Sequence, residues 1–280
     1  MLGALVALAA AAAGAFWIYH PAKPIAPSGD GRPVSSAAAR DPQAVPAGPG
    51  WHLSFDAGFT GSLLDTSVWA TCYPWADVRT GCTNFGNTEY QWFLPSQDRI
   101  SGGSLHLVAQ PVATSGRTAQ GKQEEYSCRS GMVTTYPSFR FEYGVVQVVA
   151  RIPSTGGLWS GLWLAAADLK WPPEIDILEY WGQPVDYTGL YLHPVNGPRV
   201  VAHPATGNLA AGWHTFTLYW TPDELAWFID GRADLYTSQH IPHQMMYFIA
   251  DLADYRLHQA GGCDGSLLIR SVKVWQARNG

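Results

Sequence analysis

The chain has 280 residues, which is enough for one catalytic domain and a short extension. Hydrophobic residues make up 47% of it and charged residues 14%, a balance that excludes disorder of the whole chain. The net charge of -5 and the pI of about 5.9 leave no basic excess, so we expect no nucleic-acid partner. Thirteen tryptophans and thirteen tyrosines suit either a β-sandwich core or a surface for the apolar faces of sugar rings.

The first segment, residues 2–19, is apolar, uncharged and rich in alanine, and its length fits either a signal peptide or a short membrane anchor. Ala13-Gly14-Ala15 resembles a small-residue cleavage site, whereas the aromatic residues at 16, 17 and 19 resemble an interfacial belt and favour an anchor. Both alternatives imply export. We therefore expect a protein that is secreted, periplasmic or attached to the outer side of the cytoplasmic membrane through residues 2–19.

Proline marks the next segment, residues 20–50, which has seven prolines among Gly, Ser and Ala and no apolar periodicity. This composition predicts an extended linker. The organisation that follows is a signal peptide or anchor over 1–19, a linker over 20–50 and one folded domain over 51–280.

Short strand-like runs separated by turn residues fill the folded domain, and helical periodicity is scarce there. Leu225–Ile229 follows another alternating run and is closed by Asp230-Gly231, which is a hairpin signature. Many short strands at this spacing predict an all-β fold, either a sandwich or a barrel. The clearest runs are Ser104–Ala109, Tyr143–Ile152, Trp213–Trp220 and Leu267–Trp275.

Export also permits disulfides, and the four cysteines allow three pairings. Cys72 and Cys82 stand on either side of a short loop, so a local bridge between them is the economical expectation. Cys128 and Cys263 would form a second bridge. The spacing contains no C-x-x-C element, which argues against a zinc site.

Trp171–Gly182 holds the strongest chemical signal, because three carboxylates fall within six residues between branched aliphatics. On a strand, Glu174 and Asp176 share one face, and a β-bulge around Ile177-Leu178 would return Glu179 to it. Four pleat steps then separate the two glutamates by roughly 13 Å, and inward-leaning side chains leave roughly 5 Å between carboxyls, the separation of retaining glycosidases. A solvated acidic strand edge or a calcium site is the alternative interpretation.

This segment resembles the signature of family 16 glycoside hydrolases, in the laminarinase-like branch with a bulged E-x-D-x-x-E strand. The resemblance implies a jelly-roll β-sandwich with a concave substrate groove, in which Glu174 is the nucleophile, Asp176 assists it and Glu179 is the general acid/base. It spans nearly the whole domain, through segments that include Trp51–Asp56, Gly86–Tyr90, Ser130–Thr134, Gly157–Leu164, Leu192–Pro194 and Phe228–Gly231.

The resemblance also implies substrate contacts. Trp159 and Trp163 resemble tryptophans that line the subsite beside the nucleophile, and their spacing of four lets both face one side of a strand. The remaining expected contacts are Asn87, Tyr90, Trp171, Trp181 and His193. Each aromatic could instead serve only as core packing, and the histidine could be a satisfied polar group.

Some positions depart from the family pattern. The late Asn-x-Ala segment reads Asp251-Leu-Ala253, and Arg270 stands where many members bind calcium through an Asp, so we predict no metal and no cofactor. We expect a monomeric, retaining endo-glycosidase that acts on β-1,3- or mixed-linkage β-glucan. The alternatives are a transglycosylase that uses the same three carboxylates and a non-catalytic carbohydrate-binding jelly roll.

Overall fold

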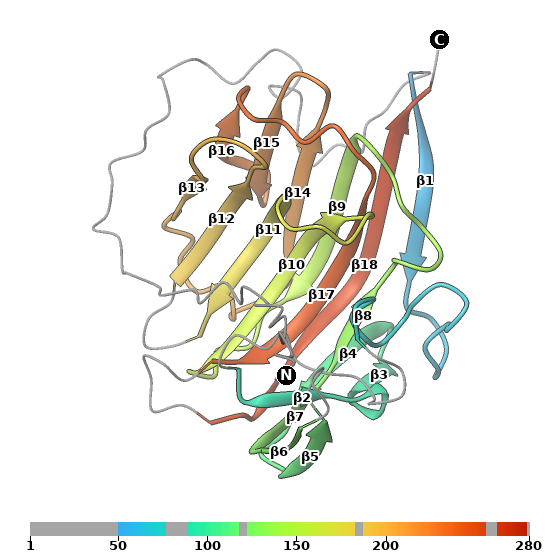
Figure 1. The fold of residues 1–280 in the computed structure, drawn as a ribbon, viewed down its shortest axis with the longest axis vertical. Helices are drawn as coiled ribbons and strands as arrows, with labels where there is room; N and C mark the ends of the chain where they lie inside the picture. Colours follow the sequence, from blue (N-terminus) through green and yellow to red (C-terminus); the bar gives the residue numbers. More distant parts are fainter. Residues whose placement is uncertain (1–49, 77–88, 118–121, 183–186, 256–261, 279–280) are drawn as a thin grey trace, which may run out of the picture.

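The computed structural model describes residues 50–76, 89–117, 122–182, 187–255 and 262–278 (Figure 1). The predicted signal peptide or anchor and all but the last residue of the predicted linker lie outside these ranges. Within them, no helix is both long enough and apolar enough to span a bilayer.

Two antiparallel sheets form the body of the domain, and the predicted all-β jelly-roll sandwich is confirmed. The larger has eight strands in the order β16-β15-β14-β9-β18-β4-β3, with β1 paired to β18. Its strands are β1 (Trp51–Gly58), β3 (Asp98–Ser101), β4 (Ser104–Ala109), β9 (Gly144–Arg151), β14 (His214–Trp220), β15 (Leu225–Ile229), β16 (Arg232–Thr237) and β18 (Gly265–Ala277).

The second sheet has six strands in the order β13-β12-β11-β10-β17-β8 (Figure 1). Its strands are β8 (Met132–Thr134), β10 (Leu158–Ala166), β11 (Glu174–Trp181), β12 (Tyr187–His193), β13 (Val200–Ala202) and β17 (Met246–Asp254). Two small ribbons complete the described structure, β2 (Gln91–Phe93) with β7 (Cys128–Ser130) and β5 (Thr114–Arg117) with β6 (Gln123–Tyr126). A single 3-10 turn, η1 (Pro95–Gln97), precedes β3.

The main core lies between the two sheets, where alternate residues of each strand meet. From the eight-stranded sheet, Val148, Phe216 and Trp227 point inward; from the six-stranded sheet, Leu164 and Ile175 do so. Period-2 alternation therefore leaves the other residues of β10, β11, β12 and β17 on the opposite side of the six-stranded sheet. We call this side the outer face.

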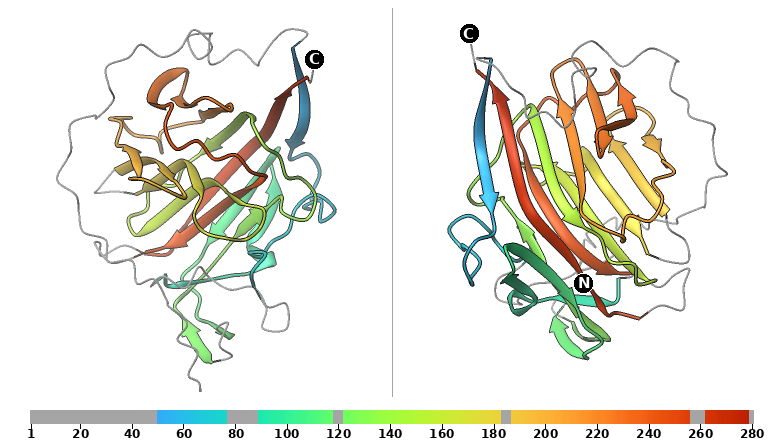
Figure 2. Two further views of the ribbon diagram at one scale, coloured as in Figure 1. Left: turned by 45° about the horizontal axis from the view of Figure 1, so that its top comes forward. Right: turned by 180° about the vertical axis from the view of Figure 1, so that it is seen from behind.

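The hairpin predicted at Asp230-Gly231 is confirmed, because β15 pairs with β16 around that turn. Both turn residues have positive φ angles, 49° and 81°, as a two-residue type I′ turn requires. The long last strand, β18, pairs with β4 along its first half and with β1 along its second, so β1 and β18 lie together at one edge (Figure 2).

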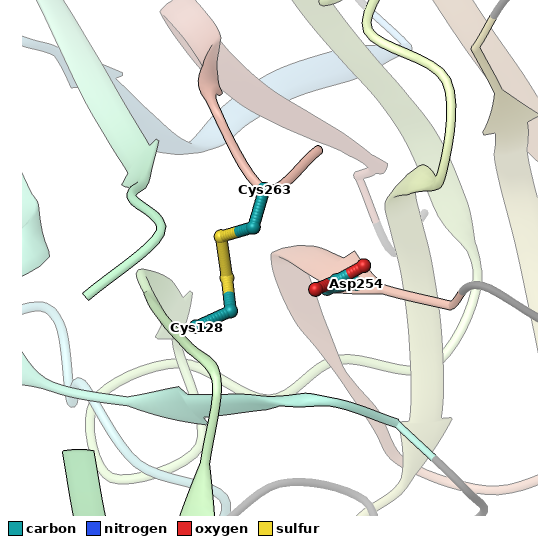
Figure 3. A group of neighbouring side chains, drawn as sticks. All are labelled: Cys128, Asp254 and Cys263. Atoms are coloured by element: carbon teal, nitrogen blue, oxygen red, sulfur yellow. A yellow bond between two sulfur atoms is a disulfide. The ribbon is translucent and has the colours of Figure 1, made fainter. Parts of the chain in front are cut away.

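A disulfide joins Cys128 to Cys263, as predicted, and ties β7 to the segment before β18 (Figure 3). The two α-carbons lie 5.9 Å apart and 135 residues apart in sequence, and the Asp254 side chain lies beside the bridge. Cys72 is also disulfide-bonded. Its predicted partner, Cys82, lies outside the described residues.

Candidate active site

The register of β11 decides where its three acidic residues point. Against β12, Asp176 pairs with Tyr191 but Glu179 pairs with Gly189, so β11 uses one residue more than its neighbour over this stretch. The two residues between Asp176 and Glu179 both pack in the core. The predicted bulge is therefore present, and Glu174, Asp176 and Glu179 share the outer face.

The bulge keeps the spacing that the two glutamates were predicted to have. Glu174 pairs with His193 and Glu179 with Gly189, so four regular steps of β12 separate them, or roughly 13 Å. Behind the bulge, the Trp227 indole on β15 donates a hydrogen bond of 2.9 Å to the backbone carbonyl of Asp176. A buried carbonyl at an irregular position thus has a partner from the opposite sheet.

Around Glu174, two predicted contact residues meet the acidic group. His193 Nε2 lies 3.6 Å from Glu174 Oε1 and 3.4 Å from Asp176 Oδ2, so one imidazole faces both carboxyls. The Trp171 side chain donates a hydrogen bond to Glu174 and lies 5.8 Å from the His193 ring, centroid to centroid. Trp171 is 45% exposed.

Glu179 stands between two glycines. Its cross-strand neighbours are Gly161 on β10 and Gly189 on β12, so no side chain rises beside it on either adjacent strand. A β-carbon at Gly189 would lie 2.5 Å from the Tyr191 hydroxyl, because that ring leans over the glycine. The absence of a side chain on either glycine therefore leaves room beside Glu179 for side chains that lean in from neighbouring rows.

Burial in this cluster raises the pKa of every carboxyl in it. Desolvation, followed by the charge of Asp176, raises the pKa of Glu174 to about 8, while His193 and the Trp171 hydrogen bond oppose the rise. Desolvation also raises the pKa of Asp176, against the pull of Arg199. The pKa of Glu179 is raised by desolvation and then by Asp176 and Glu174. Carboxyls in such a group release their protons in steps that belong to the cluster.

Two further charged residues belong to the site and were not predicted to do so. Asp251 on β17 accepts hydrogen bonds at Oδ2 from the Tyr73 hydroxyl, 2.7 Å, and from the Trp163 indole, 3.2 Å. Burial raises its pKa to about 6. Arg199, between β12 and β13, lies 5.0 Å above the Tyr191 ring and lowers the pKa of both Asp176 and Glu179. The only feature of the sequence that pointed to Asp251 was its departure from the family's Asn-x-Ala segment. No feature pointed to Arg199.

The predicted tryptophans of β10 share the outer face, as their spacing indicated, but their surroundings differ. Trp159 stacks on Trp181, with ring centroids 5.1 Å apart and planes at 14°. Trp163 is only 7% exposed and packs in a second cluster with Tyr73 and Tyr247. Its indole is therefore a structural support for Asp251 and offers little free surface to a sugar.

The remaining predicted contacts are less well placed by the structure. Tyr90 is 43% exposed, and its backbone nitrogen donates to the carbonyl of Asp254, so it stands beside the end of β17. Asn87 lies outside the described residues.

Among the described residues, two groups bring potential metal ligands together. One consists of Cys128, Asp254 and Cys263, but its two sulfurs are bonded to each other and are not free to bind a metal (Figure 3). The other is Glu174, Asp176 and His193, whose donor atoms lie within 4.8 Å of one another. This second group includes two of the three carboxylates of the predicted catalytic set, Glu174 and Asp176.

Strand β11, with its three acidic residues, lies inside a region that matches a known family. The sequence profile described as Glycosyl hydrolases family 16 matches residues 104–250, just over half of the chain. The chain belongs to glycosyl hydrolase family 16. This membership confirms the resemblance that the E-x-D-x-x-E strand predicted.

Relatives and structures of this family agree with the assignment. Endo-1,3-1,4-beta-glycanase ExsH of Rhizobium meliloti is 32% identical over 203 residues, covering 67% of this chain and 42% of that protein. A beta-glucanase of Rhodothermus marinus is 27% identical over 198 residues, 65% of this chain and 64% of that protein. This family 16 chain thus spans less than half the length of the R. meliloti relative.

Among solved structures, the laminarinase from Rhodothermus marinus superposes with a TM-score of 0.68 at 22% identity, covering 82% of this chain and 98% of that one. At this identity the likeness concerns the fold.

Proposed function

We propose that this chain is a retaining endo-glycosidase that hydrolyses β-1,3- or mixed-linkage β-glucan through a covalent glycosyl-enzyme. The observation that carries the proposal is the bulge of β11, which brings Glu174, Asp176 and Glu179 to one face with the spacing expected of two facing carboxyls. The names of two relatives, an endo-1,3-1,4-beta-glycanase and a beta-glucanase, support the substrate class.

In the first step, Glu174 attacks the anomeric carbon while Glu179 gives its proton to the leaving oxygen. The raised pKa of Glu179 suits this role, because an acid must hold its proton at the working pH. Glu174 must be ionised to attack. His193 and the Trp171 hydrogen bond are the groups that favour its charged form.

In the second step, Glu174 is bound to the sugar and has lost its charge. One of the carboxylates that raise the pKa of Glu179 is then neutral, so Glu179 can more easily lose a proton and act as a base. It removes a proton from water, and the water attacks the anomeric carbon from the side that the leaving group vacated. Two displacements give net retention.

The stereochemistry of the first product tests the proposal. Proton NMR of early products from β-glucan should show the β-anomer first, and an α-anomer would contradict the assigned roles. Glu174→Ala should abolish turnover, and azide should restore it with an activated glycoside and give the inverted glycosyl azide. Glu125→Ala, which removes an exposed glutamate on the β5–β6 ribbon, is the matched control and should leave activity unchanged.

We also propose that the protein is exported. A disulfide between Cys128 and Cys263 supports this, because such bonds persist in oxidising compartments. Fractionation of the producing cells, with the protein followed by antibody, would find it in the medium, the periplasm or the membrane fraction. Recovery from the cytosol alone would contradict the proposal.

A further inference from the structure

Asp251 belongs to the same cross-strand row as Glu179. Glu179 pairs with Gly161 on β10, and Gly161 pairs with Asp251 on β17. The two acidic residues therefore stand on alternate strands of one sheet with a single glycine between them. Their α-carbons are two strand spacings apart, or about 10 Å. Figure 1 shows β11, β10 and β17 side by side.

The Asp251 carboxyl leans across that glycine. A β-carbon at Gly161 would lie 2.5 Å from Asp251 Oδ1 and 3.4 Å from Asp251 Cγ, so the carboxyl occupies the space above the glycine. This shortens the separation between the Asp251 carboxyl and the strand of Glu179 to about one strand spacing, roughly 5 Å. Any side chain at position 161 would fill the gap.

Two donors hold the carboxyl in this position from behind. The hydrogen bonds from Tyr73 and Trp163 both end on Oδ2, whereas Oδ1 is the oxygen that lies over Gly161. Tyr73 is itself fixed by stacking on Trp75, with ring centroids 4.5 Å apart and planes at 10°. The oxygen that faces Glu179 is thus separate from the oxygen that anchors the side chain.

We propose that Asp251 is a positioning residue that acts through Glu179, its carboxylate keeping the proton on Glu179 until the leaving group needs it. The effect on catalysis rests on the proposed function, but the effect on the Glu179 proton does not. The same row of residues supplies no cation between the two carboxyls, because β10 contributes only a glycine there.

The direction of the effect follows from charge. With a pKa of about 6, Asp251 is ionised above that pH, and its negative charge makes loss of a second proton nearby harder. Asp251 raises the pKa of Glu179 and of Glu174, as a smaller contribution than their nearer neighbours make. Asp176 and Glu174 also raise the pKa of Glu179, and Arg199 lowers it. The titratable groups next to these carboxyls are His193, beside Glu174 and Asp176, Tyr247, which interacts with Glu174, and Tyr73, which interacts with Asp251, Glu174 and Glu89.

The test is a direct titration of Glu179 by carbon-13 NMR of side-chain carboxyls, with the resonance assigned by its loss in Glu179→Gln. Asp251→Asn removes the charge but keeps an amide oxygen that accepts from both Tyr73 and Trp163. The Glu179 pKa should fall by on the order of one unit, as expected for removal of one charge at this separation. An unchanged Glu179 pKa would overturn the proposal.

Asp234→Asn is the matched control, because it removes a carboxyl on β16 of the opposite sheet whose pKa burial also raises. It should leave the Glu179 titration unchanged. If Asp251→Asn fails to fold, the wild-type curve serves instead: Glu179 should show an inflection near pH 6, where Asp251 ionises, and a curve without it contradicts the coupling. Absence of β-glucan hydrolysis with an intact coupling would defeat only the proposed function.

With active enzyme, the pH dependence of kcat/KM gives a second readout. Asp251→Asn should move both limbs of the profile to lower pH, because Asp251 raises the pKa of Glu174 as well as that of Glu179. A loss of activity with no movement of the limbs would indicate a purely structural role and would contradict the proposal.

Discussion

Glu174→Gln should make the protein more stable, and the gain should grow with pH. The pKa of Glu174 is raised from 4.5 to about 8, so the folded state holds this proton more tightly than the unfolded state does. The stability that this group contributes is complete below its ordinary pKa and is lost as pH rises through the folded pKa. Glutamine keeps the shape of the protonated side chain and does not titrate.

The magnitude follows from the same shift. At 1.36 kcal/mol per pKa unit, the carboxyl lowers wild-type stability by about 1 kcal/mol at pH 5 and by about 3 kcal/mol at pH 7. The difference of about 2 kcal/mol corresponds to a Tm gain on the order of 5 °C for a domain of this size. Asp176 and His193 will adjust their own protonation in the variant, so the figure is an upper estimate.

The assay is calorimetry of wild type and Glu174→Gln from pH 5 to pH 8 at constant ionic strength. The Tm difference should widen steadily over this range. Glu125→Gln, at an exposed position on β6, should give no such trend. A Tm difference that stays constant or narrows with pH would refute the argument that burial of the Glu174 charge costs stability.

Three further outcomes are expected. Glu179→Gln should lose most activity on polysaccharide but much less in the first step on an aryl glycoside whose leaving group departs unaided; equal losses would move the acid role to another carboxyl. Gly161→Ala should lower kcat/KM roughly 10–100-fold, because the added β-carbon would lie 2.5 Å from Asp251 Oδ1. Gly58→Ala is the control and should leave kcat/KM unchanged, because the space around Gly58 is open. The double replacement Cys128→Ser/Cys263→Ser should cost about 2–5 kcal/mol in denaturant unfolding, since the bridge closes a loop of 135 residues; a smaller effect would show that the unfolded state is not constrained by it.

The sequence was sufficient for features that are local. The bulge of β11 could be predicted because Ile177 and Leu178 are consecutive aliphatics between acidic residues, and only an extra residue lets both face the core. The hairpin at Asp230-Gly231 could be predicted from its turn residues alone. In each case the identity and spacing of a few neighbouring residues were enough to predict the local structure.

Features that depend on the pairing of distant strands could not be predicted in this way. Asp251 meets Glu179 only because β10 lies between β11 and β17 in one particular register, with Gly161 as the shared partner. Trp163 is a second example. Its spacing from Trp159 correctly predicted that the two share a face. Its burial against Tyr73, from a loop some ninety residues earlier, could not be predicted, and this burial makes Trp163 a support for the Asp251 carboxyl with little exposed surface.

The hydrogen bond from Trp227 to the Asp176 carbonyl has a consequence for protein engineering. Trp227 lies on β15, in the sheet that carries none of the acidic residues, yet it holds the backbone at the bulge. Libraries that vary the hydrophobic interior for thermostability would treat this position as an interchangeable large side chain. Only a residue with a donor in the same place preserves the hydrogen bond at the bulge, so we expect Trp227→Phe to give a well-folded protein with slow turnover. Residue 227 is therefore best kept constant when the interior is redesigned.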